Sequence, residues 1–169
     1  DYHFNKVKTF HHMMDERTQE EPRAWDLEGA THRAGFKIEE LVEFVRAASP
    51  SEEDFGQALS QLHQALDKAA DKVAKKTPAQ QDLIGQVDAL IDTLYFTYGS
   101  FVLMGVDPER IFDIVHQANM GKIFPDGKAH FDPMTHKILK PDDWEEKYAP
   151  EPAIKKELQR QLKAYERHK

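Results

Sequence analysis

Apolar residues recur every three to four positions through most of the first 120 or so residues of the chain. This spacing places apolar side chains along one face of an α-helix. Together with cap residues and prolines, the pattern predicts helices over residues 4–15, 27–48, 51–76, 77–101 and 107–119. We therefore expect an all-α fold in the form of a helical bundle.

Two residue pairs mark expected helix starts. Thr77-Pro78 and Asp107-Pro108 each combine an N-cap residue with a proline, which favours the first helical position. The helix predicted after Thr77 is apolar on nearly all sides, which is typical of a helix at the centre of a fold. Its most apolar stretch, residues 94–106, is too short to span a bilayer, which needs about 20 apolar residues. We expect this stretch to belong to a buried core helix.

The sequence changes character after residue 120. Turn signals at residues 125–127 and 132–135 predict a small β-hairpin within residues 128–140. From Pro152 onward, a charged helix carries a narrow apolar stripe that consists of Ile154, Leu158, Leu162 and Tyr165. We expect this helix to pack on another surface, such as a second subunit, and not in a core.

Length, charge and cysteine content limit the remaining properties. A chain of 169 residues can hold one domain with its own core, which we place at residues 27–122, followed by the hairpin and the last helix over 123–169. The formal net charge of −7 provides no broad basic surface, so we do not expect nucleic acid as a partner. The chain has no cysteine, which fits a reducing compartment. We expect a cytoplasmic protein without a signal peptide or membrane span.

A first acidic cluster lies in the helix predicted over residues 27–48. Glu39 and Glu43 are four positions apart, and Glu40 and Glu43 are three apart, so a helix brings all three onto one side. A solvated helix face explains these glutamates equally well, because they point away from the apolar stripe around Leu41. Both interpretations stay open at this point.

A second acidic cluster lies on the apolar helix, where Asp88 and Asp92 are one turn apart. No lysine or arginine is placed to neutralise them, and carboxylates among apolar side chains are unfavourable unless they are paired or bind a metal. Packing of the two helices could bring both clusters together. Carboxylate oxygens in this number suit Mg²⁺ or Mn²⁺, and such a metal would let an acidic protein bind a ligand that carries phosphates.

These motifs resemble those of the all-α nucleotide pyrophosphohydrolases, the superfamily that includes MazG, phosphoribosyl-ATP pyrophosphohydrolase and the dimeric dUTPases. The family motif is E-E-x-x-E on one helix and E-x-x-D on a later one. Glu39-Glu40-Leu-Val-Glu43 is similar to the first half, and Asp92 is similar to the aspartate of the second half. Asn119 and Lys122 resemble a subgroup signature, and the resemblance covers about residues 36–144.

One position departs from the family motif. Ala89, three residues before Asp92, stands where the family has glutamate, and the nearest acid is Asp88. Because the fourth and third positions before Asp92 lie on neighbouring sides of a helix, Asp88 could reach the same metal. The substitution leaves the number of metal ions open, and the sequence does not define the preferred base or sugar.

The resemblance implies hydrolysis of a nucleoside triphosphate to the monophosphate and pyrophosphate, for nucleotide-pool house-cleaning. It implies that Glu39 activates the attacking water, that Lys122 contacts phosphate and that Asn119 contacts the sugar or base. The residues implied to hold Mg²⁺ (or Mn²⁺) are Glu40, Glu43, Asp88 and Asp92. By the same analogy, the protein would be a homodimer or homotetramer. A solvated lysine and a helix-end cap are the alternatives for Lys122 and Asn119.

Other interpretations have less support in the sequence. The nine histidines show no H-x-x-x-H pattern of a helical metal site. Asp113-Ile-Val-His116 is half of the paired motif of a di-iron carboxylate protein, and the other half is missing. The main rival is a non-catalytic helical interaction or regulatory module, in which the carboxylates only cap and solvate helices. An enzyme should gain thermal stability from Mg²⁺ plus a nucleotide, whereas such a module should not.

Overall fold

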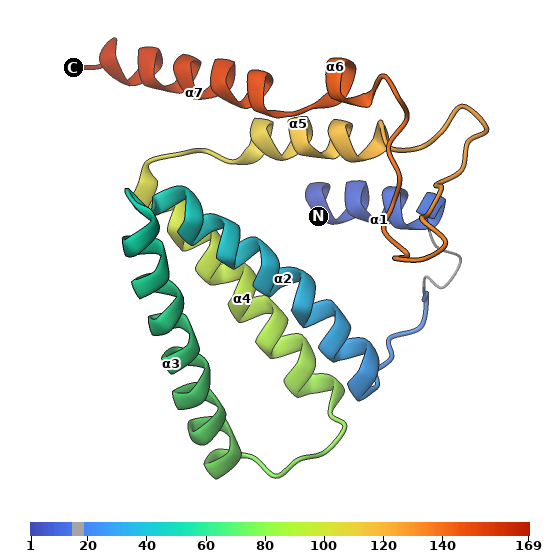
Figure 1. The fold of residues 1–169 in the computed structure, drawn as a ribbon, viewed down its shortest axis with the longest axis vertical. Coiled ribbons are helices and arrows are strands. Elements are labelled where there is room, and N and C mark those ends of the chain that lie inside the picture. The colour runs from blue at the N-terminus through green and yellow to red at the C-terminus, as the bar shows by residue number, and fades with distance from the viewer. Residues whose placement is uncertain (15–18) are drawn as a thin grey trace. The chain divides into compact units, whose positions relative to one another are not determined.

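Helices make up the regular structure of the protein, as the sequence predicts (Figure 1). The computed structural model describes residues 1–14 and 19–169. Its helices are α1 (Tyr2–Met14), α2 (Leu27–Ala48), α3 (Glu52–Lys76), α4 (Leu83–Met104), α5 (Glu109–Met120), α6 (Trp144–Tyr148) and α7 (Glu151–Glu166). The predicted helices that correspond to α2, α3 and α5 are confirmed. The first predicted helix is confirmed as far as Met14, and its expected last residue, 15, lies outside the described residues.

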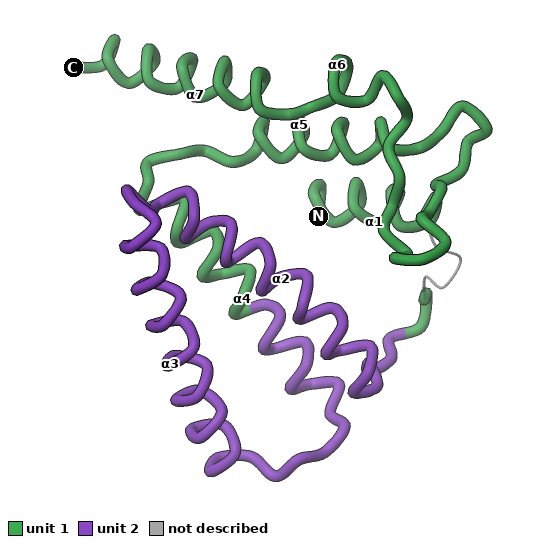
Figure 2. The backbone as a smooth tube through the Cα atoms, viewed as in Figure 1, with its two compact units in different colours: residues 1–21, 92–169 green, residues 22–91 purple. Residues whose placement is uncertain are grey.

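The chain divides into two compact units (Figure 2). The terminal unit consists of residues 1–21 and 92–169, and the 22–91 unit consists of the residues between them. Helix α4 contributes its first part to the 22–91 unit and its second part to the terminal unit. The expectation of a single domain over residues 1–169 stays a prediction.

In the 22–91 unit, side chains at the helix ends define the connection from α2 to α3. The Asp26 carboxylate accepts a hydrogen bond from a backbone N–H in the first turn of α2 at 2.7 Å, and the Ser51 hydroxyl does the same for α3 at 3.1 Å. The two helices contact each other. Arg46 near the end of α2 binds both oxygens of Glu52 at 2.5 and 2.8 Å. Caps and a bidentate ion pair therefore fix this corner.

Amide side chains tie the start of α4 to the segment before α2. Gln86 accepts a hydrogen bond from the backbone N–H of Trp25 at 2.8 Å and donates one to the Trp25 carbonyl at 3.1 Å. Gln81 donates to the same carbonyl at 3.0 Å. The 22–91 unit thereby anchors both helices that carry its predicted site residues, α2 with the glutamates and the first turns of α4 with Asp88.

The predicted start of the fourth helix is wrong. Helix α4 begins at Leu83, and residues 78–82 are not helical. Thr77 instead ends α3, because its N–H donates to the carbonyl of Val73 at 3.1 Å. Asp82 performs the capping of α4, since its carboxylate accepts a hydrogen bond from Ile84 N–H at 3.1 Å. A threonine followed by proline also suits the end of a helix, where Pro78 prevents continuation.

In the terminal unit, α5 is the helix on which the others assemble. Helices α1, α6 and α7 each contact it. Lys6 of α1 forms an ion pair with Asp113 of α5 at 2.6 Å. Gln161 of α7 exchanges two hydrogen bonds with the backbone of Asp107, at 3.0 and 2.9 Å. These polar contacts fix the position of α5, whose last turn carries Asn119.

The predicted C-terminal β-hairpin does not form in the part of the chain that the structure describes. A single antiparallel bridge joins Phe131 and Ile138. The Asp132 carboxylate accepts hydrogen bonds from two following backbone N–H groups at 2.8 and 2.9 Å. His136 adopts a left-handed φ of 58°, which β-strands do not use. The turn therefore forms where it was predicted, but only two backbone hydrogen bonds join the described segments on either side of it, from Asp132 N–H to the Lys137 carbonyl at 2.9 Å and from Leu139 N–H to the His130 carbonyl at 2.7 Å, and pairing does not extend into strands.

The prediction that α4 is a buried core helix is wrong for this chain. No residue of α4 is buried, and Leu103, Ile84 and Phe96 are 91%, 81% and 76% exposed. The buried apolar side chains among the described residues are Ala118 and Trp144. A helix that is apolar all round needs cover on every side, and one chain does not supply it. Among the described helices, none has the length and hydropathy that crossing a membrane requires.

Candidate active site

Helix α2 carries the three glutamates of the predicted motif. The helix is continuous over Leu27–Ala48, so Glu39 and Glu43 are one turn apart and Glu40 lies beside them. All three glutamates are exposed. The local structure that the motif requires is therefore present on α2.

Two cations flank these glutamates on α2 and have contacts outside the motif. Lys37 donates a hydrogen bond to the carbonyl of Arg33, one turn back, at 3.4 Å. Burial, and then the positive charge of Arg33, lower the pKa of the Lys37 ammonium. The hydrogen bonds from Arg46 hold the pKa of Glu52 below its usual value, and Glu52 raises the pKa of Arg46. Arg46 is thus committed to the connection between α2 and α3.

Asp88 lies on an open apolar groove of the 22–91 unit. The groove is formed by the first turns of α4, where the other lining residues are Leu83, Ile84, Val87 and Ile91. Asp88 itself is exposed. Asp88 therefore borders apolar side chains of its own helix, and its role as a metal ligand stays a prediction.

The two units divide the five predicted site carboxylates between them. Glu39, Glu40, Glu43 and Asp88 belong to the 22–91 unit, and Asp92 belongs to the terminal unit. Asp88 and Asp92 are one turn apart on α4, which is continuous over both. Within residues 1–14 and 19–169, no three or more His, Asp or Glu side chains are close enough to hold a metal ion. The predicted ligand set is therefore not assembled in this chain alone, and it stays a prediction.

The five candidate side chains present only oxygen donors. Carboxylate oxygens are the ligands that Mg²⁺ and Mn²⁺ prefer, whereas zinc favours histidine or cysteine. All five of these residues are exposed. The residues present therefore fit Mg²⁺ in type.

Asn119 and Lys122 lie together at the C-terminal end of α5. The Lys122 N–H donates to the Asn119 carbonyl at 3.0 Å, which holds both residues in one turn. Asn119 is half-buried, and its side-chain amide has no hydrogen-bond partner among the described residues. The structure thus brings the two predicted substrate-binding residues together, and the amide is available to a ligand.

Lys140 and Trp144 share this location, and the sequence analysis assigned them no role. Trp144 is 7% exposed, and its Nε1 donates to the carbonyl of Ala118 in α5 at 2.7 Å. The ammonium groups of Lys122 and Lys140 lie 5.8 and 4.2 Å from the centroid of the Trp144 ring. The signal in the sequence is a single tryptophan in the polar segment Lys-Pro-Asp-Asp-Trp. A tryptophan in a polar segment indicates that the segment packs against the rest of the protein at this residue, but it does not show which residues the tryptophan contacts.

The half di-iron motif on α5 takes part in structural contacts instead. Asp113 accepts hydrogen bonds from Lys6 at 2.6 Å and from the Tyr2 hydroxyl at 3.2 Å. The bond from Lys6 is the main reason that the pKa of Asp113 is lowered. Burial lowers the pKa of His116, which favours its neutral ring. Asp113 therefore joins α1 to α5 and does not belong to a metal group among the described residues.

Comparison with known proteins assigns the chain to a family. Residues 7–119 match the family model of phosphoribosyl-ATP pyrophosphohydrolase. The matched segment contains all five candidate carboxylates and Asn119. The chain belongs to the phosphoribosyl-ATP pyrophosphohydrolase family.

A solved structure is similar to this family member over almost its full length. It is the crystal structure of a "putative NTP pyrophosphohydrolase" from Exiguobacterium sp. 255-15, with 38% sequence identity and a TM-score of 0.89. The similarity covers 98% of each chain. No curated protein matches the chain. The predicted resemblance is confirmed, and the chain is a hydrolase of the phosphoanhydride bonds of nucleotides.

Proposed function

We propose that this protein is a Mg²⁺-dependent nucleoside triphosphate pyrophosphohydrolase. It would release the nucleoside monophosphate and pyrophosphate and serve nucleotide-pool house-cleaning in the cytoplasm. The observation that carries the proposal is the position of the family match, because residues 7–119 include every candidate carboxylate on α2 and α4 and also Asn119 on α5. Lys122 follows three residues later.

Glu40, Glu43, Asp88 and Asp92 would hold Mg²⁺, or Mn²⁺ in its place. When bound, the metal supplies positive charge that neutralises the phosphates of the substrate. Ala89 leaves Asp88 to take the place of the family's glutamate from the neighbouring side of α4. The spacing of Glu40 and Glu43 supports this role, because residues three apart lie on one side of the continuous helix α2.

The remaining candidates would act directly on water and substrate. Glu39 accepts the proton of the attacking water. Water adds across the bond between the α- and β-phosphates, that bond breaks, and pyrophosphate leaves. Lys122 donates hydrogen bonds to phosphate oxygens, and the Asn119 amide donates to or accepts from the sugar or base.

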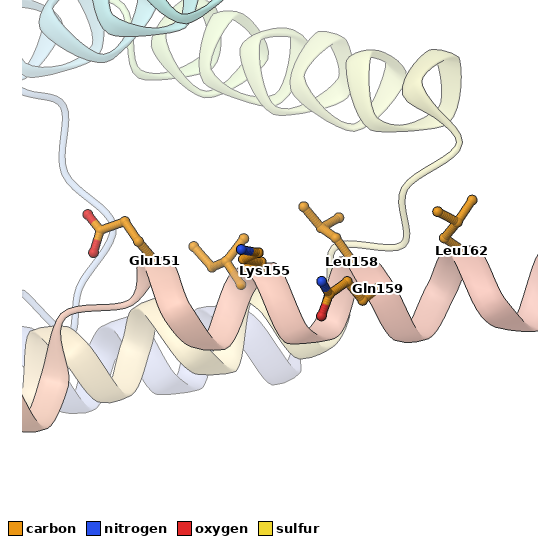
Figure 3. A pocket seen from close by; sticks show the side chains of 6 residues that line it. Glu151, Lys155, Leu158, Gln159 and Leu162 are labelled. Atoms are coloured by element: carbon orange, nitrogen blue, oxygen red, sulfur yellow. The ribbon is translucent and has the colours of Figure 1, made fainter.

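The functional form in this proposal is a homodimer or homotetramer. Exposed apolar side chains along α4 support it, because apolar surface of this extent marks an interaction site. Helix α7 carries an open groove lined by Ile154, Leu158 and Leu162, and Figure 3 shows the latter two pointing to the same side of the helix. These residues belong to the predicted stripe, and a second copy of the chain would cover them. A single-chain mass by light scattering would contradict this assembly.

The experiment that tests the proposed site measures pyrophosphate release by the Asp92→Asn variant. This substitution keeps the shape of the side chain and removes its charge, so we expect pyrophosphate release to be abolished while the far-UV circular dichroism spectrum is unchanged. Asp71→Asn on α3 is a matched control at another exposed helical aspartate, and it should keep full activity. Turnover retained by Asp92→Asn would refute the site assignment.

A further inference from the structure

We propose that Phe36 of α2 is a substrate-binding residue on which the base of the nucleotide stacks. The identity of the ligand rests on the proposed function, in which the α2 glutamates hold the metal that carries the phosphates. The new element is the contact that holds the base. The residues that carry the argument all belong to the 22–91 unit.

Phe36 lies on the same side of α2 as the three glutamates of the motif. It precedes Glu39, Glu40 and Glu43 by three, four and seven positions, and residues at these spacings share one face of a continuous helix. Ile38, two positions from Phe36, lies on the other side of the helix. Phe36 is therefore an apolar side chain within the acidic face, and it does not belong to the apolar stripe of α2.

Two neighbours one turn back contact the ring of Phe36. The ring of His32 meets it edge to face, with the centroids 4.7 Å apart and an angle of 70° between the planes. The guanidinium carbon of Arg33 lies 5.5 Å from the Phe36 centroid, within the range of a cation–π contact. Phe36 nevertheless remains 49% exposed. The two contacts restrict the ring, and about half of the surface of the residue is left for a ligand.

The separation of Phe36 from the glutamates matches the length of a nucleotide. With the rise per residue of an α-helix, Phe36 lies roughly 6 Å from Glu40 and roughly 10 Å from Glu43 along the axis of α2. A nucleotide spans a distance of this size between its base and its phosphates. Phosphates bound through Mg²⁺ at Glu40 and Glu43 would thus bring the base within reach of Phe36. Stacking on an aromatic ring is favourable for every base, because every base has a π-face.

Two simpler explanations give Phe36 no ligand. In the first, its contact with His32 one turn back only stabilises the helix. In the second, another subunit covers Phe36. The first explanation predicts that Phe36→Ala lowers Tm and leaves the affinity for nucleotides unchanged. The second predicts that Phe36→Ala changes the mass of the assembly.

The experiment titrates the protein into 2-aminopurine riboside 5′-monophosphate with Mg²⁺ present. Stacking quenches the fluorescence of this base, and a monophosphate is the product of the proposed reaction, so binding is measured without turnover. Wild type should quench the emission saturably. Phe36→Ala should raise the dissociation constant about 5- to 150-fold, the range for loss of one stack between a base and an aromatic ring. Phe36→Trp should restore most of the affinity.

Phe4→Ala on α1 is the matched control, because it removes another exposed phenylalanine, which is 61% exposed. It should leave the dissociation constant unchanged. Each variant is titrated below its unfolding transition, with the far-UV circular dichroism spectrum as the check on folding. In turnover, Phe36→Ala should raise the KM for the triphosphate with little change in kcat, since the stack is present in the ground state and the transition state alike.

Equal dissociation constants for Phe36→Ala and wild type, or no quenching by wild type, would overturn the stacking proposal. A changed assembly mass of Phe36→Ala by light scattering would also overturn it, because Phe36 would then be a subunit contact. Lack of pyrophosphate release by wild type would overturn the proposed function instead. The titration with the monophosphate would still decide whether a base stacks on Phe36.

Discussion

The substitution Trp144→Phe removes one hydrogen bond that completes the last turn of α5. The last four carbonyls of an α-helix have no partner inside the helix. In α5, following backbone N–H groups bond three of these carbonyls at 2.9, 3.0 and 3.1 Å, those of Gln117, Asn119 and Met120. Trp144 bonds the fourth, the carbonyl of Ala118. Phenylalanine keeps an aromatic ring at this position and removes the donor.

The expected loss of stability follows from the burial of Ala118. This residue is 4% exposed, so water does not readily replace the indole N–H, and a buried acceptor without a partner costs about 1–3 kcal/mol. In a chain of this length, each kcal/mol shifts Tm by about 2–4 °C. We therefore expect Trp144→Phe to lower Tm by about 2–12 °C.

Thermal unfolding followed by far-UV circular dichroism provides the assay, with Trp25→Phe as the matched control. The Trp25 side chain is 50% exposed, and its hydrogen bonds to Gln86 and Gln81 come from the backbone. The control should therefore change stability by about 0.5 kcal/mol or less. Equal Tm values for the two variants would refute the argument that Trp144 caps α5.

Two further predictions concern packing and pH. Gly121→Ala should lower stability by about 1–3 kcal/mol, because the added Cβ would overlap the Tyr148 ring. In Gly35→Ala the added Cβ meets no atom within 4 Å, so this substitution should raise stability by about 0.5–1 kcal/mol. Similar urea midpoints for Gly121→Ala and Gly35→Ala would contradict this prediction. The hydrogen bonds from Arg160 lower the pKa of Glu157 from 4.5 to about 2, so its contribution is complete above pH 4.5 and is lost as the pH falls toward 2. Glu157→Gln should flatten the fall of Tm over that range, and parallel profiles would contradict the ion pair.

Local patterns predicted most of the helices. Apolar spacing and the Ser51 cap define α3, and Asp107 before Pro108 marks the start of α5, where its carboxylate accepts a hydrogen bond from Glu109 N–H at 3.0 Å. The same logic misplaced the start of α4, because a Thr-Pro pair suits the end of one helix as well as the start of the next. The predicted turn after Phe131 is present, but the hairpin is wrong because backbone pairing between the segments on either side does not extend beyond a single bridge.

The candidate site could be predicted only in part from the sequence. The i, i+3 and i, i+4 spacing of Glu39, Glu40 and Glu43 depends on α2 being a helix, and that is confirmed. Assembly of these glutamates with Asp88 and Asp92 depends on packing between helices, which spacing along the chain does not encode. The contact of Lys140 with Trp144 is likewise tertiary.

The exposure of α4 shows that an apolar helix is not necessarily buried by its own chain. A helix that is apolar on nearly all sides predicts cover on all sides, but the sequence does not say whether that cover comes from the same chain. Here Leu103 and Ile84 are more than four-fifths exposed. Assembly of several copies would supply the cover, in agreement with the proposed homodimer or homotetramer.

The most direct test of the central claim is product analysis with the wild-type protein, Mg²⁺ and a panel of canonical and modified nucleoside triphosphates. The account predicts that at least one triphosphate yields nucleoside monophosphate and pyrophosphate in equal amounts. Release of orthophosphate with the nucleoside diphosphate, or no hydrolysis of any triphosphate in the panel, would contradict it.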